Sequence, residues 1–277
     1  MTAEQTGVAA LQTFGICSNG RAGQPLYTHI HQDCVEIVYL EKGFQVYEAA
    51  GESFSLTGGD IFVSYPNEPH GSGDFPENVC DIVWMQVNLQ EGIPFFGLEE
   101  GHAAALRAAL RGLPRQFCGD AALRESLHNA FYALSCVEWE KRFLGEQLLV
   151  CALLRMKQLA DRPRPYHAAS VGDALAFIHD NLTEPILLEE VADACGLSLS
   201  WFKMKFKEEM GVTPRDYINH VKIERAKHLL RSGFSVTAAA SAMGFNSPNY
   251  FSVTFKKYTG ETPIEYRRRH LLQKEML

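Results

Sequence analysis

The spacing of apolar residues divides the chain into a strand-rich part and two helical parts. Residues 25–89 carry short apolar runs separated by glycine and proline, which is typical of β-strands. Such runs, with turns about every eight to twelve residues, predict a small antiparallel sandwich or barrel. The expected strands are Cys34–Leu40, Phe44–Ala49, Ser53–Leu56, Ile61–Ser64 and Asp81–Leu89.

Residues 101–160 have the three- and four-residue apolar spacing of helices. Residues 103–110 are rich in alanine and leucine, which favour helix. In residues 143–159 a broad apolar surface needs a partner, which is the barrel, the neighbouring helix or a second subunit. One side of that helix carries Leu144, Leu148, Cys151 and Leu154.

Residues 171–277 contain one helical pattern written twice. The copies are offset by 48 residues as far as their glycines, Gly196 and Gly244, and by 49 residues from the phenylalanines onward. The turn of the second copy therefore carries one extra residue. Each copy has the order of a helix, a tight turn and a second helix, followed by Gly and Thr-Pro, which end one helix and begin the next.

The second helix of each copy has an apolar and a polar face. Phe202 and Phe206 lie four residues apart, as do Phe251 and Phe255, so each pair should point inward. A plain helical bundle explains these core pairs, but it does not explain a duplication with matched outward faces. Short helices of this kind fit the DNA major groove. The predicted DNA-contacting residues are Ser200, Lys203, Met204 and Lys207 in the first copy, and Asn249, Ser252, Val253 and Lys256 in the second.

Residues 186–269 resemble the paired helix-turn-helix domain of AraC/XylS-type bacterial transcription regulators. The resemblance implies a linker helix around residues 223–230 and two recognition helices that enter successive major grooves about 34 Å apart. Met204 and Val253 stand where many relatives carry a polar base-reading residue; either can contact a thymine methyl but donates no hydrogen bond. The resemblance is carried by Ala192, Gly196, Ser198, Phe206, Lys207, Gly211, Pro214, Tyr217, Ala226, Leu229, Leu230, Ala240, Gly244, Phe245, Tyr250, Phe251, Phe255, Lys256, Gly260, Thr262, Pro263, Tyr266 and Arg267.

The strand-rich part contains a cluster of histidines. The spacing G-x5-H-x-H-x4-E-x6-G, from Gly23 to Gly43, matches the first motif of the cupin barrels, and a shortened second motif keeps His70. These side chains are interpreted as lining a ligand pocket. An ordinary structural role and a metal site at His29, His31, Glu36 and His70 stay open as alternatives, because two histidines two residues apart on a strand face the same side.

The resemblance implies that this barrel senses a small polar molecule, often a sugar. No cofactor and no metal are assigned, and the chain is expected not to be an enzyme. The alternatives are a metal-dependent cupin enzyme with an attached DNA-binding domain, and a regulator with a vestigial pocket. The predicted effector-binding residues are His29, His31, Glu36, Tyr39, His70 and Trp84.

Composition changes this picture little. Residues 171–277 hold 14 Lys and Arg against 13 Asp and Glu, so the basic side chains matter through clustering rather than net charge. The seven cysteines are scattered, which favours reduced thiols and a cytoplasmic location. The sequence lacks an apolar run long enough for a membrane span and the pattern of a signal peptide.

The expected fold class is α+β multidomain, with an N-terminal antiparallel cupin-like barrel and helical segment, and a C-terminal all-α domain. The expected partners are double-stranded DNA, a small-molecule effector such as a sugar, a second copy in a homodimer, and RNA polymerase. The domain boundaries follow the changes of pattern. They are 1–100 for the sensing barrel, 101–160 for a helical segment with a dimer contact, 161–170 for a linker, and 171–277 for the DNA-binding domain.

Overall fold

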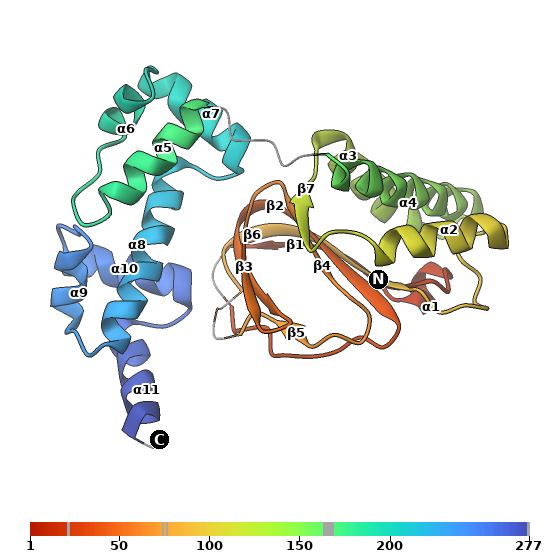
Figure 1. Ribbon diagram of the computed structural model, residues 1–277, viewed down its shortest axis with the longest axis horizontal. Coiled ribbons are helices and arrows are strands. Elements are labelled where there is room, and N and C mark those ends of the chain that lie inside the picture. The colour runs from red at the N-terminus through yellow and green to blue at the C-terminus, as the bar shows by residue number, and fades with distance from the viewer. Residues whose placement is uncertain (21–22, 74, 76, 163–168, 276–277) are drawn as a thin grey trace. The chain divides into compact units, whose positions relative to one another are not determined.

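The computed structural model describes residues 1–20, 23–73, 75, 77–162 and 169–275 (Figure 1). The chain forms two compact units. The first comprises Met1–Ser18, Leu26–Gly73 and Cys80–Arg164, and the second comprises Asn19–Pro25, Asp74–Val79 and Pro165–Leu277.

The first unit is built on an antiparallel sheet with the order β1-β6-β2-β4-β7, in which β3 and β5 pair with β2 as well. The long strand β2 organises this sheet, because residues 34–43 pair with β6, residues 36–39 with β4, and residues 44–49 with β3 and β5. The strands are β1 (Leu11–Asn19), β2 (Cys34–Ala49), β3 (Glu52–Thr57), β4 (Asp60–Ser64), β5 (His70–Gly71), β6 (Cys80–Asn88) and β7 (Gln116–Cys118).

Strand β2 separates two environments because successive side chains point to opposite faces. Val35, Ile37 and Tyr39 belong to a large core shared with the helices of the first unit. Val38 and Leu40 belong to a second apolar cluster, in the concave interior of the sheet. Glu36 follows the same alternation and therefore also lies on the inner face.

The helices of this unit are α1 (Ala3–Thr6), α2 (Glu100–Arg111), α3 (Ala121–Leu134) and α4 (Trp139–Ala160). Helices α3 and α4 lie side by side (Figure 1). Their crossing is close at Gly145, where an added Cβ would lie 2.8 Å from the backbone nitrogen of Leu134. A residue without a side chain is therefore what allows this approach.

The second unit consists of two helix-turn-helix pairs, α6–α7 and α9–α10, connected by the long helix α8. Phe202 and Phe206 are fully buried under the first pair, and Phe251 and Phe255 under the second. The helices are α5 (Ala169–Asp180), α6 (Leu188–Ala194), α7 (Leu199–Met210), α8 (Pro214–Arg231), α9 (Val236–Ala242), α10 (Pro248–Thr259) and α11 (Pro263–Glu275).

The predicted fold class is confirmed: an antiparallel sheet-rich unit is followed by an all-helical unit with two helix-turn-helix pairs. Three details differ from the expectation. The two predicted runs 34–40 and 44–49 form one strand with an irregularity between Leu40 and Lys42. Strands β1 and β5 were not predicted. The helical segment 101–160 is interrupted by β7, which pairs with β4.

The predicted linker 161–170 falls mostly on residues 163–168, which lie outside the described residues. The predicted domain boundaries stay a proposal. In the described part of the chain, none of the helices combines the length and apolar character that a membrane span requires.

The close α3–α4 crossing gives a stability prediction. Gly145→Ala should lower the free energy of unfolding by about 1–3 kcal/mol, because the new methyl group meets backbone that cannot move cheaply. Urea unfolding followed by circular dichroism measures this change. Gly101→Ala is the control: it lies in α2 with nothing within 4 Å of an added Cβ, and should stay near wild type. Equal stability of the two variants would contradict the close crossing.

Candidate functional site

Each recognition helix begins in the same way. Ser198 precedes α7 and its hydroxyl accepts a hydrogen bond from the backbone nitrogen of Trp201, at 3.4 Å. Ser247 precedes α10 and accepts in the same way from Tyr250, at 3.3 Å. The glycine of each turn has a left-handed backbone, with φ of 66° at Gly196 and 63° at Gly244. The duplication in the sequence therefore corresponds to a duplication in local geometry.

The eight predicted DNA-contacting residues all lie away from the phenylalanine core, and seven of them are exposed. Ser252 is half-buried, and its hydroxyl donates to the backbone oxygen of Pro248, at 2.9 Å. Lys203 and Lys207 form no ion pair within the described residues, so their charges are available to an anionic partner. The exposed residues are Ser200, Lys203, Met204, Lys207, Asn249, Val253 and Lys256.

Two exposed aromatic residues extend this surface. Trp201 and Tyr250 occupy equivalent positions in the first turn of α7 and α10, and are 51% and 46% exposed. Neither was among the predicted DNA-contacting residues, although Tyr250 is one of the residues that carry the family resemblance. Their aromatic character at the same place in both copies was the signal that could have found them.

The two helix-turn-helix pairs are joined through a buried lysine on α8. The Lys222 ammonium donates to the backbone oxygen of Glu184, in the loop before α6, at 2.6 Å. It also donates to the backbone oxygen of Met243, at the end of α9, at 2.8 Å. Burial lowers the pKa of Lys222 to about 8, so the side chain still carries its proton at neutral pH. One ammonium thus bonds both pairs.

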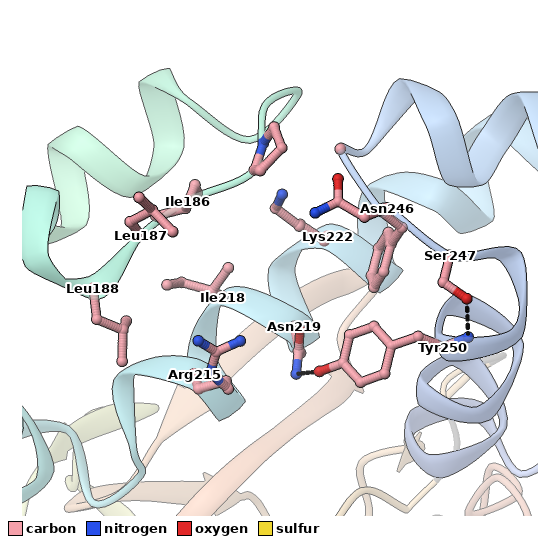
Figure 2. Close-up of a pocket in the computed structure, with 13 residues that line it drawn as sticks. Ile186, Leu187, Leu188, Arg215, Ile218, Asn219, Lys222, Asn246, Ser247 and Tyr250 are labelled. Atoms are coloured by element: carbon pink, nitrogen blue, oxygen red, sulfur yellow. Dashed lines mark hydrogen bonds between the residues drawn. The ribbon is translucent and has the colours of Figure 1, made fainter.

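The second turn also touches the first pair directly. An added Cβ at Gly244 would lie 2.5 Å from the carbonyl carbon of Glu184, so only glycine fits there. A cleft of about 320 Å³ opens beside this contact (Figure 2). Ile186 and Leu187 line it on one side and Asn246 and Tyr250 on the other. The Tyr250 hydroxyl accepts a hydrogen bond from Asn219 of α8, at 3.1 Å.

A further contact holds α10 against the start of α8. Asp216 accepts hydrogen bonds from Lys257 at 2.8 Å and from the Tyr258 hydroxyl at 3.0 Å. Burial raises the pKa of Asp216, but the hydrogen bonds from Lys257, Thr213 and Tyr258 outweigh it and hold the pKa below its usual value. Helix α8 is therefore bonded to the loop before α6, to the end of α9 and to α10.

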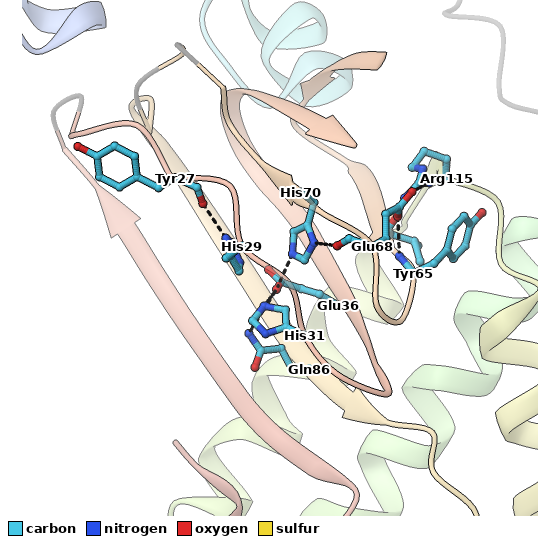
Figure 3. A network of polar contacts seen from close by, with 10 residues as sticks. Tyr27, His29, His31, Glu36, Tyr65, Glu68, His70, Gln86 and Arg115 are labelled. Carbon is cyan, nitrogen blue, oxygen red and sulfur yellow. Dashed lines mark hydrogen bonds and ion pairs between the residues drawn. The ribbon is translucent and has the colours of Figure 1, made fainter. Parts of the chain in front are cut away.

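The histidine cluster of the first unit lies on the inner face of the sheet (Figure 3). Glu36 is at its centre: one carboxylate oxygen lies 2.7 Å from His31 Nε2 and 3.4 Å from His70 Nε2. Burial raises the pKa of Glu36, but the hydrogen bonds from His31 and His70 outweigh it and lower the pKa to about 2. Glu36 is thus ionised although it is mostly buried. It makes one region of the inner face polar, next to the apolar cluster.

Strand pairing explains why these residues meet. His29 and His70 form an isolated antiparallel bridge, with backbone hydrogen bonds of 2.9 and 3.0 Å. Glu36 pairs with Gln86 of β6 on one side and with Ser64 of β4 on the other. The Gln86 amide nitrogen lies 2.9 Å from His31 Nε2, so Gln86 joins the cluster.

The prediction for Tyr39 is wrong. Its side chain is almost fully buried in the core between the sheet and the helices, on the face of β2 opposite to Glu36. Its hydroxyl donates to the backbone oxygen of Asp120, at 3.4 Å. An offset of three residues places two side chains on opposite faces of a strand, which is the physical reason for the error. Trp84 does lie on the inner face, where it packs against the apolar cluster next to Gln86.

Comparisons with known proteins agree with both parts of this geometry. A family model described as an AraC-like ligand binding domain matches residues 20–134. A family model described as a helix-turn-helix domain matches residues 191–269. The chain belongs to the AraC family of transcription regulators. Members of this family combine an N-terminal sensing domain with a C-terminal helix-turn-helix domain, and they are not enzymes.

Named relatives and solved structures are similar to this chain at moderate identity. The HTH-type transcriptional activator RhaS of Salmonella arizonae is 28% identical over 260 residues, covering 90% of each chain. The protein of the same name from Salmonella typhimurium is 27% identical with the same coverage. A structure of ToxT from Vibrio cholerae with a bound unsaturated fatty acid is 15% identical, covering 92% of this chain and 94% of that one, with a TM-score of 0.36.

The lysine on α8 gives a prediction for this AraC-family chain. Lys222→Met should leave the backbone oxygens of Glu184 and Met243 without this donor and loosen one helix-turn-helix pair from the other. The expected result is a loss of about 1–3 kcal/mol in the free energy of unfolding, together with weaker DNA binding. Thermal unfolding and a DNA titration by fluorescence anisotropy measure the two effects.

Arg225→Met is the matched control, because Arg225 is an exposed cation on the same helix. Arg225→Met should preserve both the stability of the protein and the relative placement of the two helix-turn-helix pairs. If Lys222→Met binds DNA with unchanged affinity and unfolds at the wild-type temperature, the bonds to the Glu184 and Met243 oxygens do not hold the two helix-turn-helix pairs together.

Proposed function

We propose that this protein is a cytoplasmic transcription activator of genes for carbohydrate uptake or catabolism. The observation that carries the DNA-binding part is the pair of matched recognition helices, each exposed on one face, in two helix-turn-helix pairs that Lys222 of α8 bonds to one another. The family match supplies the regulatory role, and the relatives named transcriptional activators favour activation. Activation would then require contact with RNA polymerase as well as with DNA.

The proposed reading surface consists of the outward faces of α7 and α10. Lys203 and Lys207 suit phosphate or guanine, and Asn249 suits adenine, because an amide can pair with the donor and acceptor of that base edge. Met204 and Val253 are exposed apolar side chains, 50% and 71% accessible, and are suited to thymine methyl groups. The proposed operator therefore presents thymine under both helices.

The proposed effector is a small polyhydroxylated molecule that binds on the inner face of the sheet. Glu36 and Gln86 offer hydrogen-bonding groups there, and Trp84 offers an apolar ring on the same face. Sugars combine hydroxyl groups with apolar ring faces, which suits such a mixed lining. An effector that favours the DNA-competent arrangement shifts its population by a coupling of about 1–3 kcal/mol.

The proposed dimer contact is the outer face of α4. Leu144 and Leu154 are 55% and 48% exposed, and Leu148 and Cys151 lie between them on the same side of the helix. Further apolar residues are exposed nearby, and solvent-exposed apolar surface of this extent is typical of protein contacts. These neighbouring residues are Tyr132, Val137, Trp139 and Phe143.

The reading surface is tested by Lys203→Ala and Asn249→Ala in the full chain. Each should weaken binding to an operator by about 1–3 kcal/mol, because each removes a contact to a phosphate or base. Lys141→Ala removes an exposed lysine of the first unit and should bind as wild type does. Unchanged affinity of both test variants, with an intact fold, would remove the assignment of α7 and α10 as recognition helices.

The dimer contact is tested by Leu144→Glu. A carboxylate in an apolar interface is costly to bury, so the variant should sediment as a monomer at concentrations where the wild type is a dimer. Gln90→Glu adds the same charge at an exposed position after β6 and should not change the sedimentation. Analytical ultracentrifugation decides between them, and a variant that stays dimeric would place the contact elsewhere.

A further inference from the structure

The cleft of about 320 Å³ between the two helix-turn-helix pairs carries positive charge only (Figure 2). Two cations of α8, Arg215 and Lys222, line it, and among the described residues of its lining none is acidic. The chain as a whole, in contrast, has a net charge of −7. A positively charged cleft in an acidic protein attracts anionic partners, because its walls concentrate the electric field.

The guanidinium of Arg215 is available to such a partner. Arg215 lies in the first turn of α8, is exposed, and forms no ion pair or hydrogen bond within the described part of the chain. Lys222, by contrast, already donates to two backbone oxygens. A planar guanidinium has five N–H donors, whose geometry matches the oxygens of a phosphate group. Arg215 is therefore the residue of the cleft that can bind an anion most directly.

The extra residue of the second turn lies in the same cleft. The first turn passes from Gly196 to the capping Ser198 through one residue, whereas the second passes from Gly244 to the capping Ser247 through two. The longer turn places Asn246 in the lining, where it is exposed and makes no hydrogen bond with the described residues. The first pair folds without this residue, so the fold of the turn does not explain it. An amide N–H can donate to a phosphate oxygen.

The cleft adjoins the outward face of α10. Ser247 and Tyr250 line it, and Asn249, a predicted DNA-contacting residue, lies between them at the start of α10. Leu187 and Leu188, at the start of α6, form the opposite wall. In helix-turn-helix proteins the second helix contacts base edges with its N-terminal residues, whereas the first helix crosses the sugar–phosphate backbone. A strand that borders the groove of α10 on the side of α6 therefore passes over the cleft.

We propose that the cleft binds the sugar–phosphate backbone of DNA between the two major grooves that α7 and α10 enter. Arg215 and Asn246 donate to phosphate oxygens of that strand, and the charge of Lys222 adds to the attraction. The apolar wall, in which Leu187 is 55% exposed, suits the deoxyribose carbons on either side of a phosphate. A free phosphate ion has no apolar part, so the mixed lining favours a nucleic acid strand over an inorganic anion.

This inference rests on the proposed function, because it needs a chain that binds DNA with both recognition helices. It adds a contact that reads no base, since phosphate contacts fix the position of a protein on the duplex without carrying sequence information. A backbone contact between the two recognition helices fixes the register of both. Arg215 and Asn246 are therefore positioning residues, distinct from the eight residues predicted to contact DNA.

The first experiment compares the salt dependence of DNA binding by the full chain. The probe is a fluorescein-labelled duplex that the wild-type chain selects from a random library, and anisotropy gives the association constant between about 50 and 200 mM salt. Arg215→Gln should weaken binding about 10-fold, because a charge-assisted hydrogen bond is lost. It should also reduce the slope of log K against log salt concentration by about 0.9, the value for one phosphate. Arg215→Lys keeps the charge and should keep the slope.

Variants of matched chemistry serve as controls. Arg225→Gln removes an exposed cation of the same helix that does not line the cleft, so its affinity and slope should equal those of the wild type. Asn246→Asp keeps the shape of the side chain but replaces a donor by a negative charge, so it should weaken binding more than Asn246→Ala does. Arg215 and Asn246 are exposed, and all these variants should unfold at the wild-type temperature.

The second experiment locates the contact on the DNA. Single phosphates of the duplex are replaced in turn by neutral methylphosphonates. The wild type should lose affinity at a position between the two selected base clusters, and Arg215→Gln should lose nothing further there, because a direct contact couples the two changes. An unchanged salt slope in Arg215→Gln, or equal losses by wild type and Arg215→Gln at every replaced phosphate, overturns the proposal.

The two experiments separate this inference from the proposed function. Weaker binding by Lys203→Ala, together with wild-type behaviour of Arg215→Gln, overturns the backbone contact in the cleft and leaves the recognition helices assigned. A wild-type chain that selects no duplex from the library overturns the DNA-binding function, and the backbone contact with it.

Discussion

The DNA-reading arrangement depends on the bonds that one buried ammonium makes to two backbone oxygens. Lys222 lies on the helix between the two helix-turn-helix pairs and donates to Glu184 of the first and Met243 of the second. A charged donor makes stronger hydrogen bonds than a neutral one, and the Lys222 side chain is itself almost fully buried. Gly244 also lies close to the same loop, so steric contact limits the position of the second turn in addition to the hydrogen bonds of Lys222. Together they fix the distance between two short helices that, taken alone, would be marginally stable.

In the first unit, the single strand β2 contributes side chains to two different environments. The odd-numbered side chains of β2 from Val35 to Tyr39 pack against the helices and stabilise the unit. The even-numbered side chains face the interior of the sheet. There Glu36 lies at the centre of a polar cluster, and Val38 and Leu40 belong to an apolar cluster. A ligand or ion bound at Glu36 is therefore one residue along the strand from the helical core. That proximity gives a physical path by which binding could alter the helices.

Much of this could be predicted from the sequence because local signals were strong. The repeated glycines, serine caps and phenylalanine pairs specified both helix-turn-helix units, including the extra residue in the second turn. Other features depend on contacts between distant residues, which one sequence does not show. Strand β5 exists only because His70 and Gly71 pair with the end of β2. The role of Lys222 depends on two oxygens that lie 38 and 21 residues away, and Tyr39 was misplaced because strand alternation was not applied to it.

We expect each chain to read DNA with two helices that are held at a fixed spacing. Selection of binding sites by the full chain from a library of random DNA duplexes tests this expectation most directly. We expect each protomer to select two short conserved clusters, with thymine in both, centred about 10 to 10.5 base pairs apart. We also expect an insertion of about half a helical turn between them to abolish tight binding. A single contiguous motif that tolerates such insertions at its edge would contradict the account.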